Sequence, residues 1–263
     1  MIKFCTLFSS SSGNCTFVSS GKTKLLMDAG VSCKDISEEL KCISVEPKEI
    51  QGIFITHEHS DHTKGAGTFA RKYNVPVYAT DETWENMEHY FTSLPEKFKK
   101  IIDKQNIEAV GDIGVKAFSI PHDAADPVGY CFFNGEKKIT LATDVGHISA
   151  ELEANLSGSN AVLLEANHDI SMLRNGSYSY RLKQRILGDY GHLSNDNCAR
   201  LALRLVKQGT RDILLGHLSA ENNRPDLAYN STCDMLEAAG AKVGHDIRLF
   251  VATKNYASCE III

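Results

Sequence analysis

Residues 52–62 read GIFITHEHSDH, an apolar run that leads directly into four potential metal ligands. The run GIFIT has the short, β-branched character of a buried strand. The ligands that follow it are His57, His59, Asp61 and His62. Because side chains two residues apart in an extended segment point the same way, His57 and His59 can hold one ion. Asp61 and His62, at the turn into the next helix, can reach a second ion.

Further ligands are expected elsewhere in the chain, because one short cluster cannot complete two coordination shells. Three side chains meet this expectation, since each directly follows an apolar run: His122 in FSIPHDAADP, Asp144 in ITLATDVGH and His217 in DILLGHLS. Asp144 has two carboxylate oxygens and can bridge both ions. Imidazole and carboxylate ligands suit zinc, manganese or iron, and the lack of a thiolate argues against a purely structural zinc site.

Short apolar runs alternate with segments of helical periodicity along the chain. Strands are expected at 2–8, 15–20, 24–30, 52–56, 75–79, 115–120, 129–133, 138–144, 161–166, 212–216 and 247–252. Helices are expected at 33–42, 63–73, 81–91, 147–156, 180–188, 195–208 and 225–239. The chain opens with hairpins and then mixes strands with helices. This order favours an α/β fold of two sheets packed face to face with helices outside, in a single domain over residues 1–263.

The composition is that of an ordinary globular protein, with 43% hydrophobic and 23% charged residues among 263. A net charge of −5 argues against a protein that coats nucleic acid by charge alone, but it is compatible with a local basic groove. No apolar run approaches the roughly 18 residues that span a bilayer, and residues 1–15 carry no signal-peptide pattern. The eight cysteines are scattered without a C-x-x-C pair. We therefore expect a cytoplasmic protein with reduced thiols and no membrane partner; the sequence does not specify an oligomeric state.

Several motifs together resemble the metallo-β-lactamase superfamily: THEHSDH at 56–62, DAG at 28–30, PHD at 121–123, TD at 143–144 and a late GHLS. The match runs the length of the chain and implies a four-layer αββα sandwich. Longer stretches resemble the YycJ/WalJ group of DNA exonucleases within this superfamily. They are FSSSSGNC at 8–15, PHDAADPVGY at 121–130, LLEANHD at 163–169 and YSYRLKQRILGDYGHLSNDN at 178–197.

The resemblance implies two divalent metal ions, zinc or manganese with iron as a further option, held by side chains from separate loops. His57, His59 and His122 would hold the first ion, Asp61, His62 and His217 the second, and Asp144 would bridge them. A hydroxide shared by the two ions would attack phosphorus, because paired metals lower the pKa of bound water toward neutrality. The implied activity is that of a metal-dependent phosphodiesterase, a DNA exonuclease with 5′-to-3′ polarity.

The tetrapeptide Gly-His-Leu-Ser occurs twice, at 191–194 and 216–219. The second copy follows an apolar strand and resembles the last ligand motif of the superfamily, which assigns His217 to a metal. The first copy precedes a helix and resembles an element of tRNA-maturing endonucleases whose histidine faces the scissile phosphate. The resemblance therefore makes His192 a catalytic residue that protonates the leaving oxygen, with Glu165 orienting it and Asp61 positioning the proton of the nucleophile.

Substrate contacts are expected from residues near these motifs, with nucleic acid as the partner and DNA favoured over RNA. Lys183 and Arg185 can contact backbone phosphates. Ser12 and Asn14 belong to a polar turn that either binds phosphate oxygens or serves only as a hairpin loop. His168 either faces the same site or is a surface histidine. Three further histidines, His89, His147 and His245, stand apart from the motifs and are interpreted as structural or solvated.

Other functions of the same fold remain open at this stage. A lactamase, lactonase or thioesterase would use similar ligands, although Asp144 stands where a lactamase has a thiol and the segment PHDAADP differs from the glyoxalase pattern. A di-iron oxygen or nitric oxide reductase would have glutamate in place of His59. A third alternative is a non-catalytic relative without metals, against which the complete ligand set argues.

Overall fold

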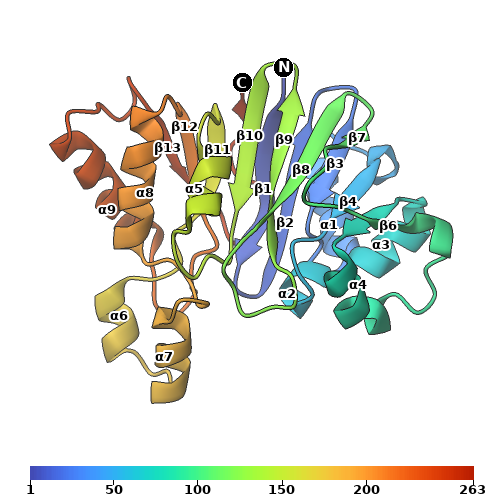
Figure 1. Cartoon of the computed structure of the whole chain (residues 1–263), viewed down its shortest axis with the longest axis horizontal. Coiled ribbons are helices and arrows are strands. Elements are labelled where there is room, and N and C mark those ends of the chain that lie inside the picture. Colours follow the sequence, from blue (N-terminus) through green and yellow to red (C-terminus); the bar gives the residue numbers. More distant parts are fainter.

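Two β-sheets pack face to face and helices cover the outer side of each (Figure 1). This computed structural model describes residues 1–263 except for the side chain of residue 90. The layer order, helices, sheet, sheet, helices, is the αββα sandwich expected from the sequence. Both termini lie at one end of the sandwich, and α2 (Ser60–Thr63), α6 (Ile170–Asn175) and α7 (Tyr180–Leu187) lie toward the other end (Figure 1).

Sheet A has the strand order β14-β1-β2-β3-β4-β5-β6. Its strands are β1 (Lys3–Ser10), β2 (Gly13–Ser19), β3 (Lys24–Met27), β4 (Gly52–Phe54), β5 (Val77–Ala79), β6 (Lys99–Ile101) and β14 (Ile261–Ile262). Pairing is antiparallel from β14 to β3 and parallel from β3 to β6. The parallel strands β3 and β4 therefore end at the same edge of the sheet, and the segments that follow them lie side by side there.

Sheet B has the strand order β13-β12-β11-β10-β9-β8-β7. Its strands are β7 (Glu108–Val110), β8 (Ile113–Ser119), β9 (Val128–Asn134), β10 (Lys137–Ala142), β11 (Ala161–Glu165), β12 (Asp212–Gly216) and β13 (Arg248–Val251). Strands β10 to β13 are parallel. Because β11 and β12 are buried along their whole length, they read as continuous apolar runs without alternation.

Helices lie on the outer side of both sheets. Beside sheet A are α1 (Cys33–Cys42), α3 (Ala66–Tyr73) and α4 (Asp81–Met87), and beside sheet B are α5 (Ala150–Leu156), α8 (Asn195–Lys207) and α9 (Pro225–Ala238) (Figure 1). The start of α8 is fixed by Ser194, whose hydroxyl accepts a hydrogen bond from the Asn197 N–H. Gly209, at φ +104°, follows its end. The helix therefore agrees with the range 195–208 expected from the sequence.

The core between the sheets is aromatic near the end that carries the polar motifs. Phe54 and Tyr78 of sheet A stack with ring centroids 4.4 Å apart, and Tyr130 of sheet B meets Phe54 edge-on at 5.5 Å. The Tyr130 hydroxyl donates to the Ile55 carbonyl at 2.6 Å, so this buried polar group is satisfied and ties the two sheets together. The segment that leads to His57 is thereby held rigidly.

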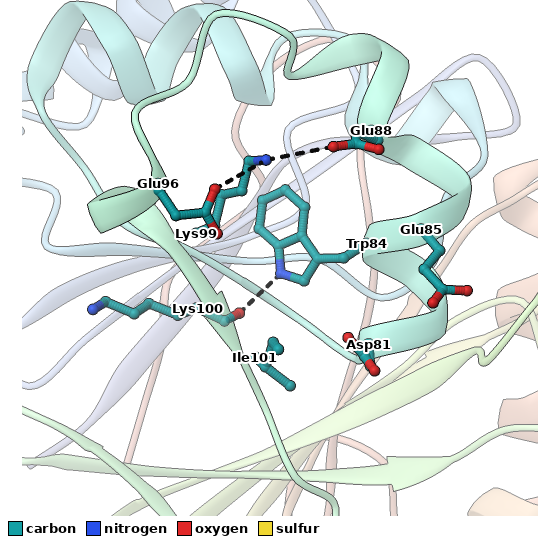
Figure 2. A pocket seen from close by; sticks show the side chains of 8 residues that line it. All are labelled: Asp81, Trp84, Glu85, Glu88, Glu96, Lys99, Lys100 and Ile101. Carbon is teal, nitrogen blue, oxygen red and sulfur yellow. Dashed lines mark hydrogen bonds and ion pairs between the residues drawn. The ribbon is translucent and has the colours of Figure 1, made fainter.

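Some short elements were not expected from the sequence, and β6 is the clearest example. Its lysines belong to the basic run 95–100, which has the character of a solvated surface, yet Lys99–Ile101 pairs with β5 at the edge of sheet A. Trp84 of α4 donates from Nε1 to the Lys100 carbonyl at 2.9 Å. Figure 2 shows the pocket of about 340 Å³ that lies between α4 and β6. None of its lining residues is a predicted site residue.

None of the helices in the described chain is long and apolar enough to cross a membrane.

Candidate metal centre

The predicted metal ligands converge at the edge where the parallel strands of both sheets end. His57 and His59 follow β4, and His122 lies in the loop between β8 and β9. Asp144 follows β10 and His217 follows β12. Rigid strands thus place each ligand, although the ligands are up to 160 residues apart in sequence.

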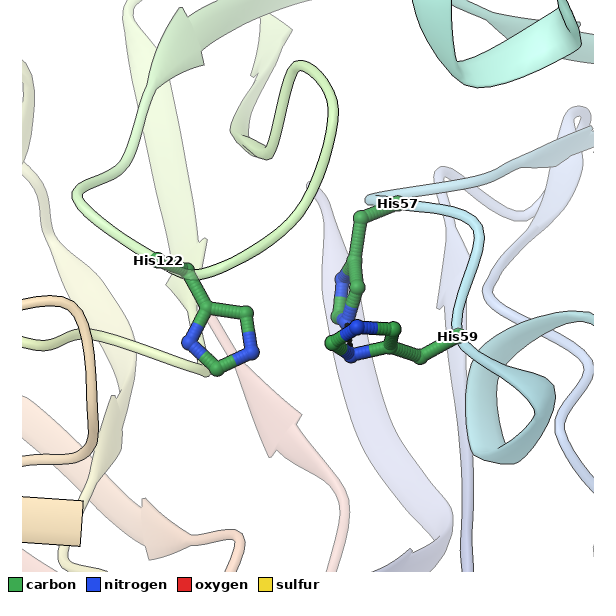
Figure 3. Close-up of side chains that lie close together, drawn as sticks. All are labelled: His57, His59 and His122. Carbon is green, nitrogen blue, oxygen red and sulfur yellow. Dashed lines mark hydrogen bonds between the residues drawn. The ribbon is translucent and has the colours of Figure 1, made fainter. Parts of the chain in front are cut away.

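Three imidazoles form the first group of ligands. Nε2 of His57 lies 3.0 Å from Nδ1 of His59. The His122 ring is 5.1 Å from the His57 ring and 5.4 Å from the His59 ring, measured between centroids. Figure 3 shows the three rings turned toward one another from two loops. One nitrogen of each lies within 4.8 Å of the others, close enough for a single ion to join them.

The second group consists of Asp61, His62 and His217, whose ligand atoms also lie within 4.8 Å of one another. Asp144 stands between the two groups. Its Oδ2 lies 3.2 Å from Nε2 of His62, and its Oδ1 lies 3.7 Å from Nε2 of His122. Asp144 thus has one carboxylate oxygen near each of the two groups.

Unsatisfied buried atoms indicate that this cluster fits metal ions. Among the described residues, Nε2 of His217 and Oδ2 of Asp144 are buried without a hydrogen-bond partner. Such atoms are costly unless an ion or a water satisfies them. Burial and the neighbouring imidazoles keep the pKa of His57 well below its usual value, so this ring is neutral and its lone pair is free for a cation. Imidazoles with carboxylates are the donor set of zinc and manganese sites.

Asp28, to which no role was assigned from the sequence, supports the cluster through hydrogen bonds to His62 and Thr56. Its Oδ2 accepts a hydrogen bond from Nδ1 of His62 at 2.8 Å, and its Oδ1 accepts one from the Thr56 N–H at 2.9 Å. Both side chains of the Asp28–His62 pair are fully buried. By engaging Nδ1, Asp28 leaves Nε2 of His62 directed at Asp144, which is how carboxylates commonly orient metal-binding histidines. The only signal in the sequence was the DAG motif at the end of an apolar strand.

Glu165, the last residue of β11, connects the two Gly-His-Leu-Ser segments. Its Oε1 accepts hydrogen bonds from Nδ1 of His192 at 2.9 Å and from Nδ1 of His217 at 2.7 Å. Its Oε2 accepts the backbone N–H groups of Val145 and Leu193. Burial alone would raise the pKa of Glu165, but the two histidines outweigh it and lower the pKa to about 2. The carboxylate is therefore ionised and fixed by four hydrogen bonds.

The backbone is strained at three of these residues. Asp28, Asp144 and His217 have φ values of +62°, +58° and +54°, a region that side-chain-bearing residues rarely adopt. Each lies just after the end of a strand. Such strain persists where the surrounding structure enforces it and is common at functional sites. Here the positive φ at each strand end directs the polar side chain toward the cluster.

The predicted substrate-binding residues lie in different surroundings. The guanidinium of Arg185 pairs with Asp123, the neighbour of the ligand His122, at the edge of the cluster. The ammonium of Lys183 instead donates to the Arg174 and Gly176 carbonyls, which places it at the end of α6. The Asn14 amide lies 3.1 Å from Nε2 of His62. Ser12 is exposed, and its hydroxyl contacts that of Ser10.

His168 is not a surface histidine, so that alternative was wrong. Its side chain is 1% exposed, and neither ring nitrogen has a hydrogen-bond partner among the described residues. Burial lowers its pKa to about 4, so the ring is neutral. The exposed side chains of His89, His147 and His245 agree with the interpretation that these residues are structural or solvated.

His192 lies within reach of the metal ligands as well as of Glu165. One atom each from Asp144, Glu165, His192 and His217 falls within 4.8 Å of the others. The geometry alone therefore permits His192 to bind metal or to face a substrate. Nδ1 of His192 is engaged by Glu165, which leaves the other ring nitrogen free of this contact, and the His192 side chain is the most exposed of the four.

Comparison with known proteins agrees with this arrangement. A family model described as "Metallo-beta-lactamase superfamily" matches residues 10–217. The chain belongs to the metallo-β-lactamase superfamily. It is 41% identical to exodeoxyribonuclease YycJ of Bacillus anthracis, over 92% of both chains, and 40% identical to exodeoxyribonuclease WalJ of Streptococcus pneumoniae, over 97% of this chain and 96% of that one. It is therefore a hydrolase of this superfamily, in the group that contains YycJ and WalJ.

The fold is also seen in solved structures of low sequence identity. The metallo-β-lactamase fold protein YhfI from Bacillus subtilis superposes with a TM-score of 0.72 at 14% identity, over 98% of both chains. At this identity the similarity concerns the fold alone. The expected αββα sandwich is thus confirmed.

Proposed function

We propose that the chain is a dinuclear-metal exonuclease that removes nucleotides from DNA, starting at the 5′ end. The observation that carries this proposal is the convergence of seven ligand side chains, with His192 and its partner Glu165 beside them. The relatives named exodeoxyribonucleases, at 40–41% identity over nearly the whole chain, support DNA as the substrate. The 5′-to-3′ polarity is carried over from the resemblance to the YycJ/WalJ group.

In this proposal each metal is held by side chains that the fold brings together. His57, His59 and His122 would hold the first cation. Asp61, His62 and His217 would hold the second, with Asp144 between the two groups. When bound, zinc or manganese ions would supply a shared hydroxide at neutral pH and a clamp for the phosphoryl oxygens.

His192 acts as the general acid for the leaving oxygen. Burial by itself lowers the pKa of His192, but the carboxylate of Glu165 outweighs this effect and raises the pKa above its usual value. The imidazolium therefore persists to higher pH than that of a free histidine, and its nitrogen remote from Glu165 carries a proton to donate. Asp61 positions the proton of the nucleophile. Although burial raises the pKa of Asp61, contact with His62 outweighs it and lowers the pKa, so the carboxylate is ionised.

The surface beside the metal centre suits a nucleic acid strand. Arg185 and the exposed rings of Tyr180 and Tyr190 belong to α7 and to the loop that leads from it to His192. Tyr190 is held there by its carbonyl, which accepts the Asp123 N–H at 3.1 Å. Cations combined with exposed aromatic rings are typical of surfaces that bind single strands without sequence preference.

We further propose that residues 1–263 form one domain in the cytoplasm. Strands from both halves of the chain contribute to the core between the sheets. The structure pairs none of the described cysteines in a disulfide, which is usual for a reducing compartment.

End-labelled DNA tests the proposed function. Wild-type protein loaded with manganese should release the label of a 5′-labelled strand as a mononucleotide from the start, whereas a 3′ label should stay in long products until late. RNA of the same sequence should be degraded more slowly. The Asp144→Ala variant should lose activity and metal together. Hydrolysis of nitrocefin or of a thioester without hydrolysis of any nucleic acid would overturn the proposal in favour of another hydrolase of this superfamily.

A further inference from the structure

A pocket of about 490 Å³ opens next to the metal centre, and no predicted site residue lines it. It lies between the end of β1, the loop after β12, the start of α9 and the loop after β13. The residues that shape it include Ser9, Leu218, Ser219, Pro225, Val251 and Tyr256. Its volume is that of a small-molecule site, large enough for one nucleoside but not for a longer stretch of a strand.

The pocket and the ligand His217 share the same strand end. The hydroxyl oxygen of Ser9 accepts a hydrogen bond from the His217 N–H at 2.8 Å. Leu218 and Ser219 directly follow His217 in the chain. The Ala252 N–H donates to the Leu215 carbonyl at 2.7 Å, which keeps the loop after β13 beside β12. When a phosphate is held at the metal centre, the nucleoside attached to it can therefore reach the pocket.

The walls of the pocket are chemically suited to a base and its sugar. Leu218, Pro225 and Val251 provide apolar surface, and the Tyr256 ring is 62% exposed. Tyr256 is positioned by a turn in which the Thr253 hydroxyl donates to its carbonyl. Aromatic rings stack on any base, because every base has a π-face.

Two buried hydroxyls give the pocket polar contacts as well. Ser9 is 5% exposed and Ser219 is 8% exposed. The oxygen of Ser9 accepts the His217 N–H, and that of Ser219 accepts the Asn222 N–H. Each hydroxyl proton therefore remains available for an acceptor on a ligand, such as a sugar or base oxygen.

We propose that this pocket binds the terminal nucleoside of the strand, the unit that is released when the scissile phosphate occupies the metal centre. The inference rests on the proposed nuclease function and specifies its substrate subsite. The apolar walls and the Tyr256 ring recognise the presence of a base without reading its identity. Such a pocket accepts a strand end whatever its terminal base.

Kinetics with a modified strand end test the inference. The substrates are a 5′-labelled single strand with a normal terminal thymidine and the same strand with a terminal abasic tetrahydrofuran. For the wild type, loss of the base should raise KM about tenfold, because stacking on an aromatic side chain contributes on the order of a factor of ten per base. Tyr256→Ala should abolish the difference between the two substrates, and Tyr256→Phe, which keeps the ring, should retain it.

A second variant fills the pocket instead of enlarging it. Pro225 is exposed and occupies the first turn of α9, where other residues are tolerated. Pro225→Trp should raise KM for the normal strand and leave KM for the abasic strand nearly unchanged. Ile107→Ala, which removes an exposed apolar side chain that does not line the pocket, is the control and should resemble the wild type.

Calorimetric titration with thymidine 5′-monophosphate separates this inference from the proposed function. Wild type and Tyr256→Phe should bind the nucleotide, and Tyr256→Ala and Pro225→Trp should bind it at least tenfold more weakly. Nucleotide binding that depends on Tyr256, in a protein that degrades no DNA, would overturn the nuclease assignment and uphold the pocket. DNA degradation with an unchanged ratio of KM values in Tyr256→Ala would overturn the pocket and leave the nuclease assignment standing.

Discussion

Oε1 of Glu165 accepts hydrogen bonds from both His192 and His217, so one buried carboxylate holds the histidines of the two Gly-His-Leu-Ser segments. In each ring the bond engages Nδ1, which directs Nε2 away from Glu165. Nε2 of His217 is then buried without a hydrogen-bond partner in the described chain, as a metal ligand requires, whereas His192 is partly exposed. The two identical tetrapeptides thus place their histidines on the same carboxylate, that of Glu165, but one histidine is buried and the other is partly exposed.

Replacement of Glu165 by Gln should shift the pH dependence of cleavage. The carboxylate raises the pKa of His192, so the wild-type imidazolium persists above the usual range and is lost only as the pH rises through the raised pKa. In Glu165→Gln the falling limb of kcat should move to lower pH. The rate at neutral pH should drop about 10- to 100-fold, as is common when the partner of a functional histidine is removed. Rates measured between pH 6 and pH 9 check this. An unchanged falling limb would show that His192 is not the titrating group.

Variants of Asp144 and His192 should separate metal binding from proton transfer. Asp144→Ala removes the carboxylate shared by both ligand groups and should empty the site. His192→Ala should retain two metal ions per chain and cleave more slowly, by about 10²- to 10⁴-fold, the usual contribution of a general acid. Elemental analysis of each purified variant gives the metal content. A loss of one ion in His192→Ala would assign His192 to the ligands, a role that its distance to Asp144 and His217 also permits.

The sequence predicted which side chains converge, because the proposed ligands follow apolar strands. Four ligands lie within six residues, and His122, Asp144 and His217 each come directly after a run that had to be a strand. The carboxyl ends of parallel strands meet at one edge of a sheet, so such ligands converge once the strands pair. The residues that follow apolar runs in the sequence are therefore the same residues that the strand pairing brings together.

The contacts that orient the ligands were less accessible to sequence reasoning. Asp28 reaches His62 across 34 residues, and this pairing exists only because β3 and β4 are neighbours in sheet A. His168 looked equally compatible with a surface loop, but it is buried, and its carbonyl accepts the Asn195 N–H. The edge strand β6 was missed because its three residues include two lysines, and strand propensity is weak in so short a segment.

Gly30→Ala should disrupt the centre although it replaces none of the proposed ligands. A Cβ at Gly30 would lie 1.6 Å from the carbonyl oxygen of Asp61, so the turn that carries Asp61 and His62 would have to move. The Gly30 N–H also donates to the Asn14 carbonyl at 2.8 Å, which prevents the glycine from moving away. We expect a loss of stability of about 1–3 kcal/mol or more from such overpacking, together with weaker metal binding.

Thermal unfolding with and without added manganese measures both effects of the Gly30 change. The wild type should gain several degrees from the metal, because an ion that binds only the folded state stabilises it. Gly30→Ala should unfold at a lower temperature and gain less. Gly21→Asn is the control, since no atom lies within 4 Å of a Cβ there, although the positive φ makes it slightly unfavourable. Equal metal responses in wild type and Gly30→Ala would contradict the prediction.

Arg185→Ala should weaken DNA binding in a way that depends on salt. The Arg185 guanidinium is at the edge of the metal centre, and its pKa is raised, first by the hydrogen bond to Asp123, so its charge is constant. If it contacts a backbone phosphate, its removal should reduce the slope of log K against log salt concentration by about 1.

Arg200→Ala, on the exposed face of α8, is a control of equal charge change and should leave the slope unaltered. Binding should be measured with a metal-free, inactive Asp144→Ala background, so that the strand is not degraded. Equal slopes for the Arg185 and Arg200 variants would mean that the strand leaves the metal centre along another surface.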